Sequence, residues 1–170
     1  MDMITEGTHI ARHEADRRIP AAQAGEYLTY RLGGEEYGVD IQKVQEIRSY
    51  EQPTRIPNVP PFIKGVVNLR GVIVPIVDLR LKLNCATAEY TTFTVVIVLA
   101  VMGRVVGVVV DSVSDVLNLE AAAIKEPPGL AGESGPDFIT GIASVGERML
   151  MLVNIESLLG DAALGVGEAA

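Results

Sequence analysis

Short runs of apolar residues, broken by glycine and proline, set the pattern of the N-terminal half of the chain. Residues 27–32 predict a strand, and residues 37–41 predict a returning strand. The glycine pair Gly33-Gly34 between them predicts a hairpin turn, because glycine accepts the positive φ that such turns need. Residues 43–50 alternate apolar and polar side chains, which predicts a short strand or one turn followed by a strand.

A proline-rich stretch, residues 53–61, separates these strands from the next pair. Its four prolines exclude a helix interior and predict an extended surface loop. Residues 62–78 have the pattern of a strand, a tight turn at Arg70-Gly71 and a second strand. Residues 78–83 then predict a short helix, with Asp78 as its N-cap.

The second half of the chain repeats the same order of elements. The expected elements are a hairpin at 91–100 and 104–110, an alternating segment at 111–119, a proline- and glycine-rich loop at 127–136, strands at 138–144 and 148–153, and a helix at 154–160 that ends at a glycine. Residues 95–110 are also nearly long enough to span a membrane. Met102-Gly103-Arg104 interrupts them with a glycine and a charge, which favours a hairpin turn between two buried strands.

The two halves also share residues in a fixed frame, which indicates an internal duplication. The alignment that places Phe62 on Phe138 also places Gly65 on Gly141 and Asp78 on Asn154, without a gap. A second block, at positions 38–47, repeats at positions 107–116. Chance similarity between valine-rich strands explains the aliphatic matches, but it does not easily explain paired Phe, Gly and Asx positions.

The duplication predicts an all-β fold of two small barrels, each of about five short strands. The barrels are expected to pack side by side and to leave an apolar groove between them. The main repeat blocks cover residues 26–83 and 91–159, within one domain at 25–160. Residues 1–24 are expected to form a flexible N-terminal tail, and residues 161–170 a C-terminal tail.

Composition and charge narrow the possible partners. The chain has 170 residues, 48% of them hydrophobic, and a formal net charge of −8. An acidic chain is a poor match for nucleic acid phosphates or for an anionic membrane surface. Residues 1–25 show no apolar stretch of the kind that forms a signal peptide. These features predict a cytoplasmic protein whose partners are proteins and which does not insert directly into a membrane.

Candidate chemistry is sparse. The single cysteine, Cys85, excludes an internal disulfide, and both histidines, His9 and His13, lie in the N-terminal segment. No zinc-ligand spacing or phosphate-binding loop occurs, so neither a metal nor a cofactor is expected. Asp111 and Asp115 form the best carboxylate pair, for which a strand end and a solvated turn is the simpler interpretation. The alternative is a small β-barrel ligand binder or hydrolase that uses these two aspartates.

The polar feature of greatest interest is Arg70, at the tip of a turn in an otherwise apolar stretch. Residues 62–80, FIKGVVNLRGVIVPIVDLR, closely resemble the signature of the CheW family of bacterial chemotaxis coupling proteins. The resemblance extends from about Glu26 to Gly160. The other segments that carry it are 36–41, 43–48, 104–111, 113–117 and 148–155.

The resemblance implies two intertwined five-stranded SH3-like barrels with short helices. It also implies a non-enzymatic scaffold that couples the cytoplasmic tips of methyl-accepting chemotaxis receptors to the histidine kinase CheA, within membrane receptor arrays. The receptor's helical hairpin would enter the groove between the barrels. The implied receptor-binding residues are Glu46, Arg70, Val95 and Val116, and the implied kinase-binding residues are Val44 and Gly65. For the three valines an ordinary core role stays open.

Overall fold

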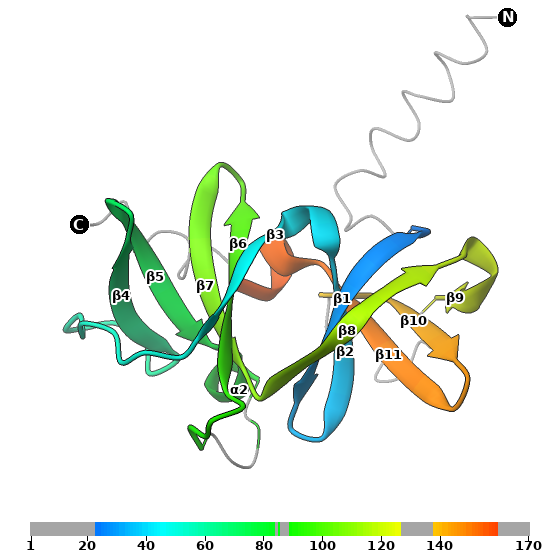
Figure 1. Cartoon of the computed structure of the whole chain (residues 1–170), viewed down its shortest axis with the longest axis horizontal. Helices are drawn as coiled ribbons and strands as arrows, with labels where there is room; N and C mark the ends of the chain where they lie inside the picture. Colours follow the sequence, from blue (N-terminus) through cyan, green and yellow to red (C-terminus); the bar gives the residue numbers. More distant parts are fainter. Residues whose placement is uncertain (1–22, 84, 86–88, 127–137, 160–170) are drawn as a thin grey trace, which may run out of the picture.

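Two β-sheets form the body of the molecule (Figure 1). The computed structural model describes residues 23–83, 85, 89–126 and 138–159, so both predicted tails, apart from residues 23 and 24, and the predicted loop at 127–136 lie outside the described residues. One sheet contains, in spatial order, β8 (Ser112–Leu119), β1 (Gly25–Leu32), β2 (Glu35–Asp40), β11 (Arg148–Val153), β10 (Ile139–Val145) and β9 (Ile124–Lys125). The other contains β3 (Val44–Ser49), β6 (Val95–Val101), β7 (Arg104–Val110), β5 (Val72–Asp78) and β4 (Ile63–Leu69).

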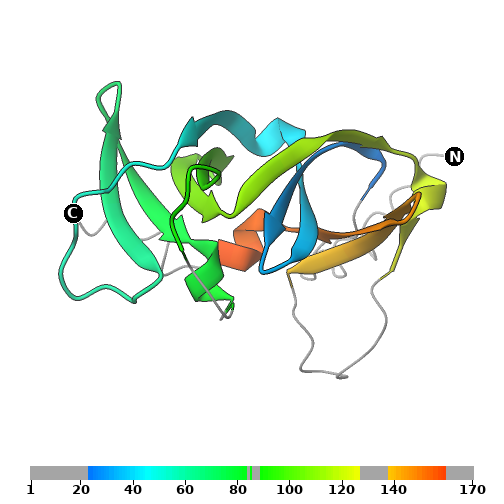
Figure 2. The ribbon, with the colours of Figure 1, turned by 60° about the horizontal axis from the view of Figure 1, so that its bottom comes forward.

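The chain crosses between the sheets twice, which confirms the prediction of intertwined units. The β1–β2 hairpin belongs to the sheet of the C-terminal strands, and the short 3-10 helix η1 (Ile41–Lys43) leads to β3 in the other sheet. The chain returns between β7 and β8. Figures 1 and 2 show the result as two sheets side by side along the long axis.

Strand order supports the duplication. The five-stranded order β3-β6-β7-β5-β4 becomes β8-β1-β2-β11-β10 when each strand is replaced by its counterpart from the other half of the chain. A β-bulge interrupts β4–β5 between Ile63 and Gly65, and another interrupts β10–β11 between Ile139 and Gly141. The two bulges occupy equivalent positions in the frame found in the sequence. Within the described residues, β9, a two-residue strand after the 3-10 helix η2 (Ala121–Ala123), adds a sixth strand to the expected five.

All three hairpin turns predicted from the sequence are present, and Gly33 and Gly34, between β1 and β2, have φ values of 59° and 88°. Arg70 and Gly71 have φ values of 53° and 90°, and Met102 and Gly103 have φ values of 51° and 76°. Two consecutive positive φ values are typical of the tight turns that match the twist of antiparallel strands. No helix within the described part of the chain is long and apolar enough to cross a membrane.

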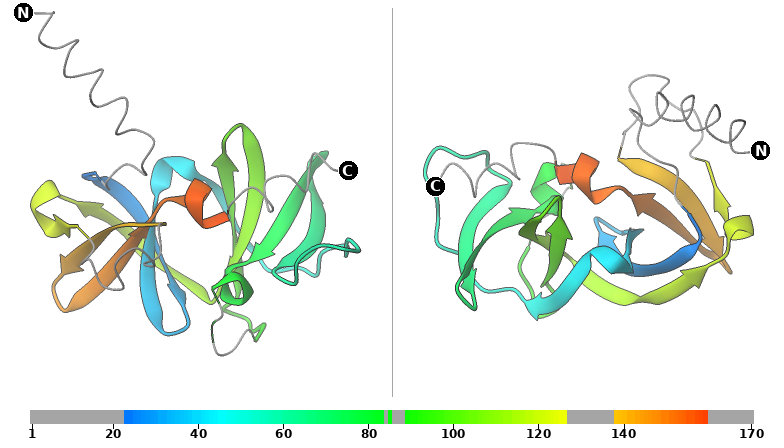
Figure 3. Two further views of the ribbon diagram at one scale, coloured as in Figure 1. Left: turned by 180° about the vertical axis from the view of Figure 1, so that it is seen from behind. Right: turned by 90° about the horizontal axis from the view of Figure 1, so that it is seen from above.

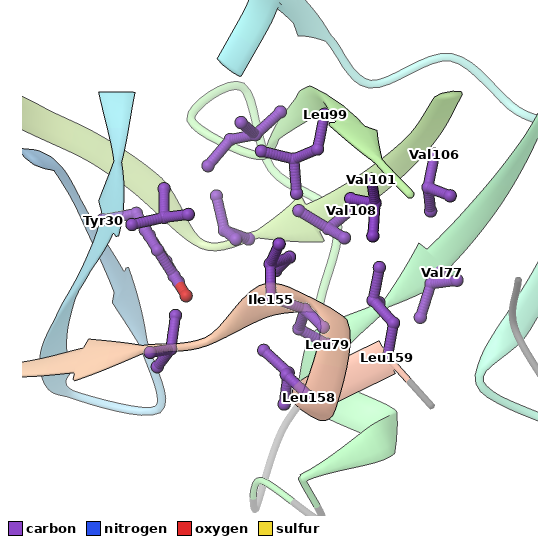
Figure 4. Packing of buried hydrophobic residues seen from close by; sticks show 14 of the residues in the cluster. Tyr30, Val77, Leu79, Leu99, Val101, Val106, Val108, Ile155, Leu158 and Leu159 are labelled. Atoms are coloured by element: carbon purple, nitrogen blue, oxygen red, sulfur yellow. The ribbon is translucent and has the colours of Figure 1, made fainter. Parts of the chain in front are cut away.

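The main core lies between the two sheets and contains residues from both (Figure 4). Helix α2 (Leu79–Lys82) follows β5, and a helical turn at residues 155–159 follows β11; Figure 3 shows this last turn between the sheets. The predicted N-cap Asp78 is confirmed, because its Oδ1 accepts the Arg80 amide at 3.0 Å, and at the equivalent position Asn154 Oδ1 accepts the Ser157 amide at 2.9 Å. Ile155, Leu158 and Leu159 then point into the shared core.

One polar group in this core, the Tyr30 hydroxyl, has no hydrogen-bond partner among the residues that the structure describes. Tyr30 is buried. Its burial raises the pKa of the Tyr30 phenol far above the ordinary value. Tyr30→Phe is therefore expected to raise the free energy of unfolding by about 1 kcal/mol, since it removes an unsatisfied buried hydroxyl.

Tyr27→Phe is the matched control for this prediction. The Tyr27 hydroxyl donates to the Gln23 carbonyl at 2.5 Å, so its loss is expected to lower stability. Urea unfolding of both variants measures the difference. Equal destabilisation by the two substitutions would show that the Tyr30 hydroxyl does have a partner in solution.

Candidate partner-binding site

Arg70 stands at the tip of the β4–β5 hairpin, where the turn fixes its position. The Asn68 side chain accepts the Gly71 amide at 2.8 Å across the turn. This bond holds the backbone on both sides of Arg70. The Arg70 side chain is 70% exposed, so much of its guanidinium faces solvent.

Arg70 forms an ion pair with Glu46 of β3, and Arg48 holds the other carboxylate oxygen at 3.1 Å. The pair joins the two edge strands of the five-stranded sheet, because β3 and the β4–β5 hairpin lie at opposite ends of the strand order. Hydrogen bonds from Arg70 and then from Arg48 lower the pKa of the Glu46 carboxyl. Two guanidiniums thus share one ionised carboxylate, and the cluster presents net positive charge to a partner.

The two sheets present apolar side chains to each other where β3 and β8 border the core. Directly opposite residues on antiparallel strands share a sheet face. Ile47 lies opposite Ile97, and both Ile97 and Leu28 belong to the core between the sheets. Val116 lies opposite Leu28. Ile47, which is 45% exposed, and Val116, which is 47% exposed, therefore face the boundary between the barrels from its two sides.

We name this apolar surface the seam groove, after the groove between the barrels that was predicted from the sequence. Its members, all partly or largely exposed beside the shared core, are Val44, Ile47 and Val95 on the five-stranded side and Val113 and Val116 on the six-stranded side. Three of the residues singled out in the sequence, Val44, Val95 and Val116, thus lie on this surface. Ile47 was not singled out, although its counterpart in the repeated block is Val116.

Gly65 is buried, so a binding partner would not touch it directly. Its φ is +141°, and a Cβ atom at this position would lie 2.0 Å from the Thr54 carbonyl oxygen. The close approach allows Thr54 and Val66 to exchange backbone hydrogen bonds of 2.8 and 2.9 Å, which hold the loop at residues 50–62 against β4. Any effect of Gly65 on a partner would therefore pass through this loop.

Gly65→Ala is expected to destabilise the protein more than an alanine at an unobstructed positive-φ glycine. Gly103→Ala is the control, because Gly103 has a φ of +76° and a Cβ there would meet nothing within 4 Å. The control incurs only the backbone strain of about 1–2 kcal/mol, and Gly65→Ala adds an overpacking cost of about 1–3 kcal/mol. Chemical denaturation compares the two, and equal losses would mean that the loop moves away without cost.

Asp111 and Asp115 do not form a catalytic carboxylate pair, because each is held by a different arginine. Asp111 accepts Arg80 Nη1 at 3.1 Å and the Gly33 amide at 2.9 Å. Asp115 accepts Arg148 at 3.1 Å and the Thr29 hydroxyl at 2.5 Å. The bonds from Arg148 and Thr29 lower the pKa of the Asp115 carboxyl. Both aspartates thus serve as structural acceptors.

Arg80 and Arg148 were given no role on the basis of the sequence. Arg80 is 1% exposed and makes a bidentate pair with Asp78, with both N–O distances at 3.0 Å. Arg148 joins Glu36 at 2.7 Å to Asp115 at 3.1 Å. An arginine two residues after a predicted N-cap aspartate was the available signal for Arg80. For Arg148 the sequence contained no such signal, because Arg148 follows a turn, and an exposed cation is ordinary at that position.

The molecule is a double barrel whose charges are paired internally. It exposes two candidate binding surfaces, the seam groove and the β4–β5 turn around Arg70. These features are those of a protein-binding scaffold. The family model for the CheW-like domain matches residues 26–163. The chain therefore belongs to the CheW-like family.

Relatives support this membership. The chain is 58% identical over 134 residues to the chemotaxis protein CheW of Klebsiella aerogenes, covering 79% of this chain and 81% of that protein. It is 38% identical to the chemotaxis protein CheW of Rhizobium meliloti, covering 78% and 86%. The crystal structure of the scaffolding protein TtCheW from Thermoanaerobacter tengcongensis matches with a TM-score of 0.75 and 28% identity, over 83% of this chain and 96% of that one. The prediction of a scaffold rather than an enzyme is confirmed by these relatives.

Proposed function

We propose that this protein couples the cytoplasmic helical tips of chemotaxis receptors to the histidine kinase CheA. Membership of the CheW-like family and the names of the relatives support a role in chemotaxis. In this role the protein resides in the cytoplasm and joins receptor arrays through protein contacts. A coupler has to bind two partners at once, so it needs two separate surfaces on one rigid body.

The observation that carries the proposal is the alternation of side chains along β3. Glu46 lies opposite Val98, which belongs to the core inside the five-stranded barrel, whereas the neighbouring Ile47 lies opposite Ile97 at the seam. Successive strand residues point to opposite faces of a sheet. The Arg70–Glu46 pair and the seam groove therefore lie on opposite faces of the same strand, close together but able to bind different partners.

We propose that the seam groove receives the receptor tip. An amphipathic helix buries an apolar stripe in such a groove, and the aliphatic side chains of Val95 and Val116 suit that contact. The polar Glu46 and Arg70 were predicted to join them, and Val44 and Gly65 to contact the kinase. Val44 is a member of the groove, and Gly65 lies beneath the loop at residues 50–62, so single-variant binding to each partner separately decides between the two groupings.

Val116→Glu is expected to weaken binding of a receptor-tip fragment by about tenfold or more, because a charge replaces an apolar contact in the groove. Val116 is already largely exposed, so little loss of stability is expected. Met102→Glu is the matched control, since Met102 is exposed at the β6–β7 turn and outside the groove. Isothermal titration with the fragment measures both affinities. Equal affinities of the two variants would remove the groove as the receptor site.

A further inference from the structure

A polar network, buried at Asp78 and Arg80, lies near the point where the chain crosses from one barrel to the other. At its centre, Arg80 binds Asp78 through two hydrogen bonds and donates from Nη1 to the Glu89 carbonyl at 2.5 Å. The Tyr90 ring lies 4.7 Å from the Arg80 guanidinium carbon, and its hydroxyl donates to Asp78 Oδ2 at 2.6 Å. All these groups belong to β5, α2 and the segment that precedes β6, on the five-stranded side.

Asp111 extends this network to the other barrel. It is the single residue between β7 and β8, where the chain passes from the five-stranded to the six-stranded sheet. From the first sheet, Arg80 Nη1 donates to its Oδ1 at 3.1 Å. From the second, the amide of Gly33 in the β1–β2 turn donates to Oδ2 at 2.9 Å, and the Asp111 amide donates to the Arg31 carbonyl at 3.0 Å.

We propose that Asp111 is a positioning residue: held by Arg80 from one barrel and by the β1–β2 turn from the other, it fixes the angle between the barrels and thereby the width of the seam groove. The shared core is mainly aliphatic, and apolar contacts are non-directional, so they tolerate small rotations. Hydrogen bonds are directional, and they weaken steeply when bent. The groove has one wall on each barrel, so a change of angle moves Val116 relative to Ile47.

The inference rests on the proposed function only where it concerns receptor binding. The angle itself can be measured on the protein alone, from residual dipolar couplings of backbone amides fitted separately for the strands of each sheet. If the two barrels are held at one angle, the couplings of both sheets fit the same alignment tensor. In Asp111→Ala, the tensor fitted to one sheet is expected to differ in magnitude from the tensor fitted to the other. Asp111→Asn, which retains a carbonyl acceptor but not the charge, is expected to lie between this variant and the wild type.

Asp115→Asn is the matched control, because Asp115 lies on β8, four residues after Asp111, and its side-chain hydrogen bonds within the described residues go to Thr29 and Arg148, both on its own sheet. It is expected to keep a common tensor. If the correct angle is populated a tenth of the time in Asp111→Ala, the affinity for a receptor-tip fragment falls about tenfold.

If the two sheets share one alignment tensor in both Asp111→Ala and Asp111→Asn, the inference is overturned, even with receptor binding intact. Loss of the dispersed amide spectrum in both variants would also overturn it, because Asp111 would then be required for folding rather than for the angle. Different tensors in Asp111→Ala, with no receptor binding by the wild type, would support the positioning role and contradict the proposed function.

Discussion

Arg70→Glu is expected to abolish receptor-dependent activation of CheA while the double barrel stays folded. Arg70 is largely exposed, and its ion pair with Glu46 is at the surface, where such pairs contribute little to stability. Arginine is enriched among the residues that dominate binding energy at interfaces, and reversal of its charge also places a carboxylate next to Glu46. A loss of partner affinity of about thirtyfold or more is expected, as for other hot-spot residues.

Circular dichroism and titration with each partner test this expectation. Lys125→Glu is the control, because it makes the same change of net charge at an exposed position on the six-stranded sheet. The charge-swapped variant Arg70→Glu with Glu46→Arg separates two explanations. If Arg70 contacts a partner, the swap does not restore activation. Restoration would mean that the pair acts only by joining β3 to the β4–β5 hairpin.

Arg80→Met is expected to cause the largest loss of stability, about 3–5 kcal/mol, as found when one member of a buried ion pair is removed. Asp78 would be left fully buried with Tyr90 as its remaining side-chain donor. Lys82→Met, on the same short helix, is the control. Lys82 lies half-buried over the Phe62 ring at 4.3 Å, so its loss is expected to cost about 1 kcal/mol or less.

The pH dependence of stability distinguishes the loss of the Asp78–Arg80 ion pair from a simple packing defect. Burial raises the pKa of Asp78, but the hydrogen bonds from Arg80 and Tyr90 outweigh it and hold the pKa below the ordinary value. A depressed carboxyl pKa contributes stability that is complete above the unfolded pKa of about 3.9 and is lost as the pH falls through the folded pKa. In Arg80→Met the buried carboxyl favours its protonated form, so its pKa rises and acidification stabilises the variant.

The stability difference between wild type and Arg80→Met is therefore expected to narrow from pH 7 towards pH 4. Urea unfolding at several pH values measures it. A constant difference would mean that Arg80 stabilises the fold through its aliphatic stem rather than through Asp78. The double variant Asp78→Asn with Arg80→Met is expected to recover part of the loss, because no buried charge remains unpaired.

The sequence predicted most of the local structure and the duplication. Period-two alternation located β3 and β8, and the Gly33-Gly34 and Arg70-Gly71 turns located two hairpins. It did not predict from periodicity which sheet each strand joins, because alternation defines the two faces of a strand but not its neighbours. The exchange of the β1–β2 hairpin into the C-terminal sheet was expected only from the family resemblance.

The candidate site was predicted in part. Glu46 and Arg70 were named separately, and the structure joins them across 24 residues of sequence. The contacts of Arg80 and Asp111 were not predicted, because they depend on the tertiary position of α2 against the β7–β8 crossing. Gly65 was named as a binding residue, but the approach of Thr54 that requires a glycine there is a contact between loop and strand with no local sequence pattern.

The central claim, coupling of receptor to kinase, is tested most directly by phosphotransfer in a reconstituted system of receptor cytoplasmic fragment, CheA and this protein. We predict that CheA autophosphorylation stays near its basal rate with receptor alone and rises strongly when the protein is added. We also predict that the protein without CheA gives no turnover. The same rate with and without the protein, in the presence of receptor, would contradict the account.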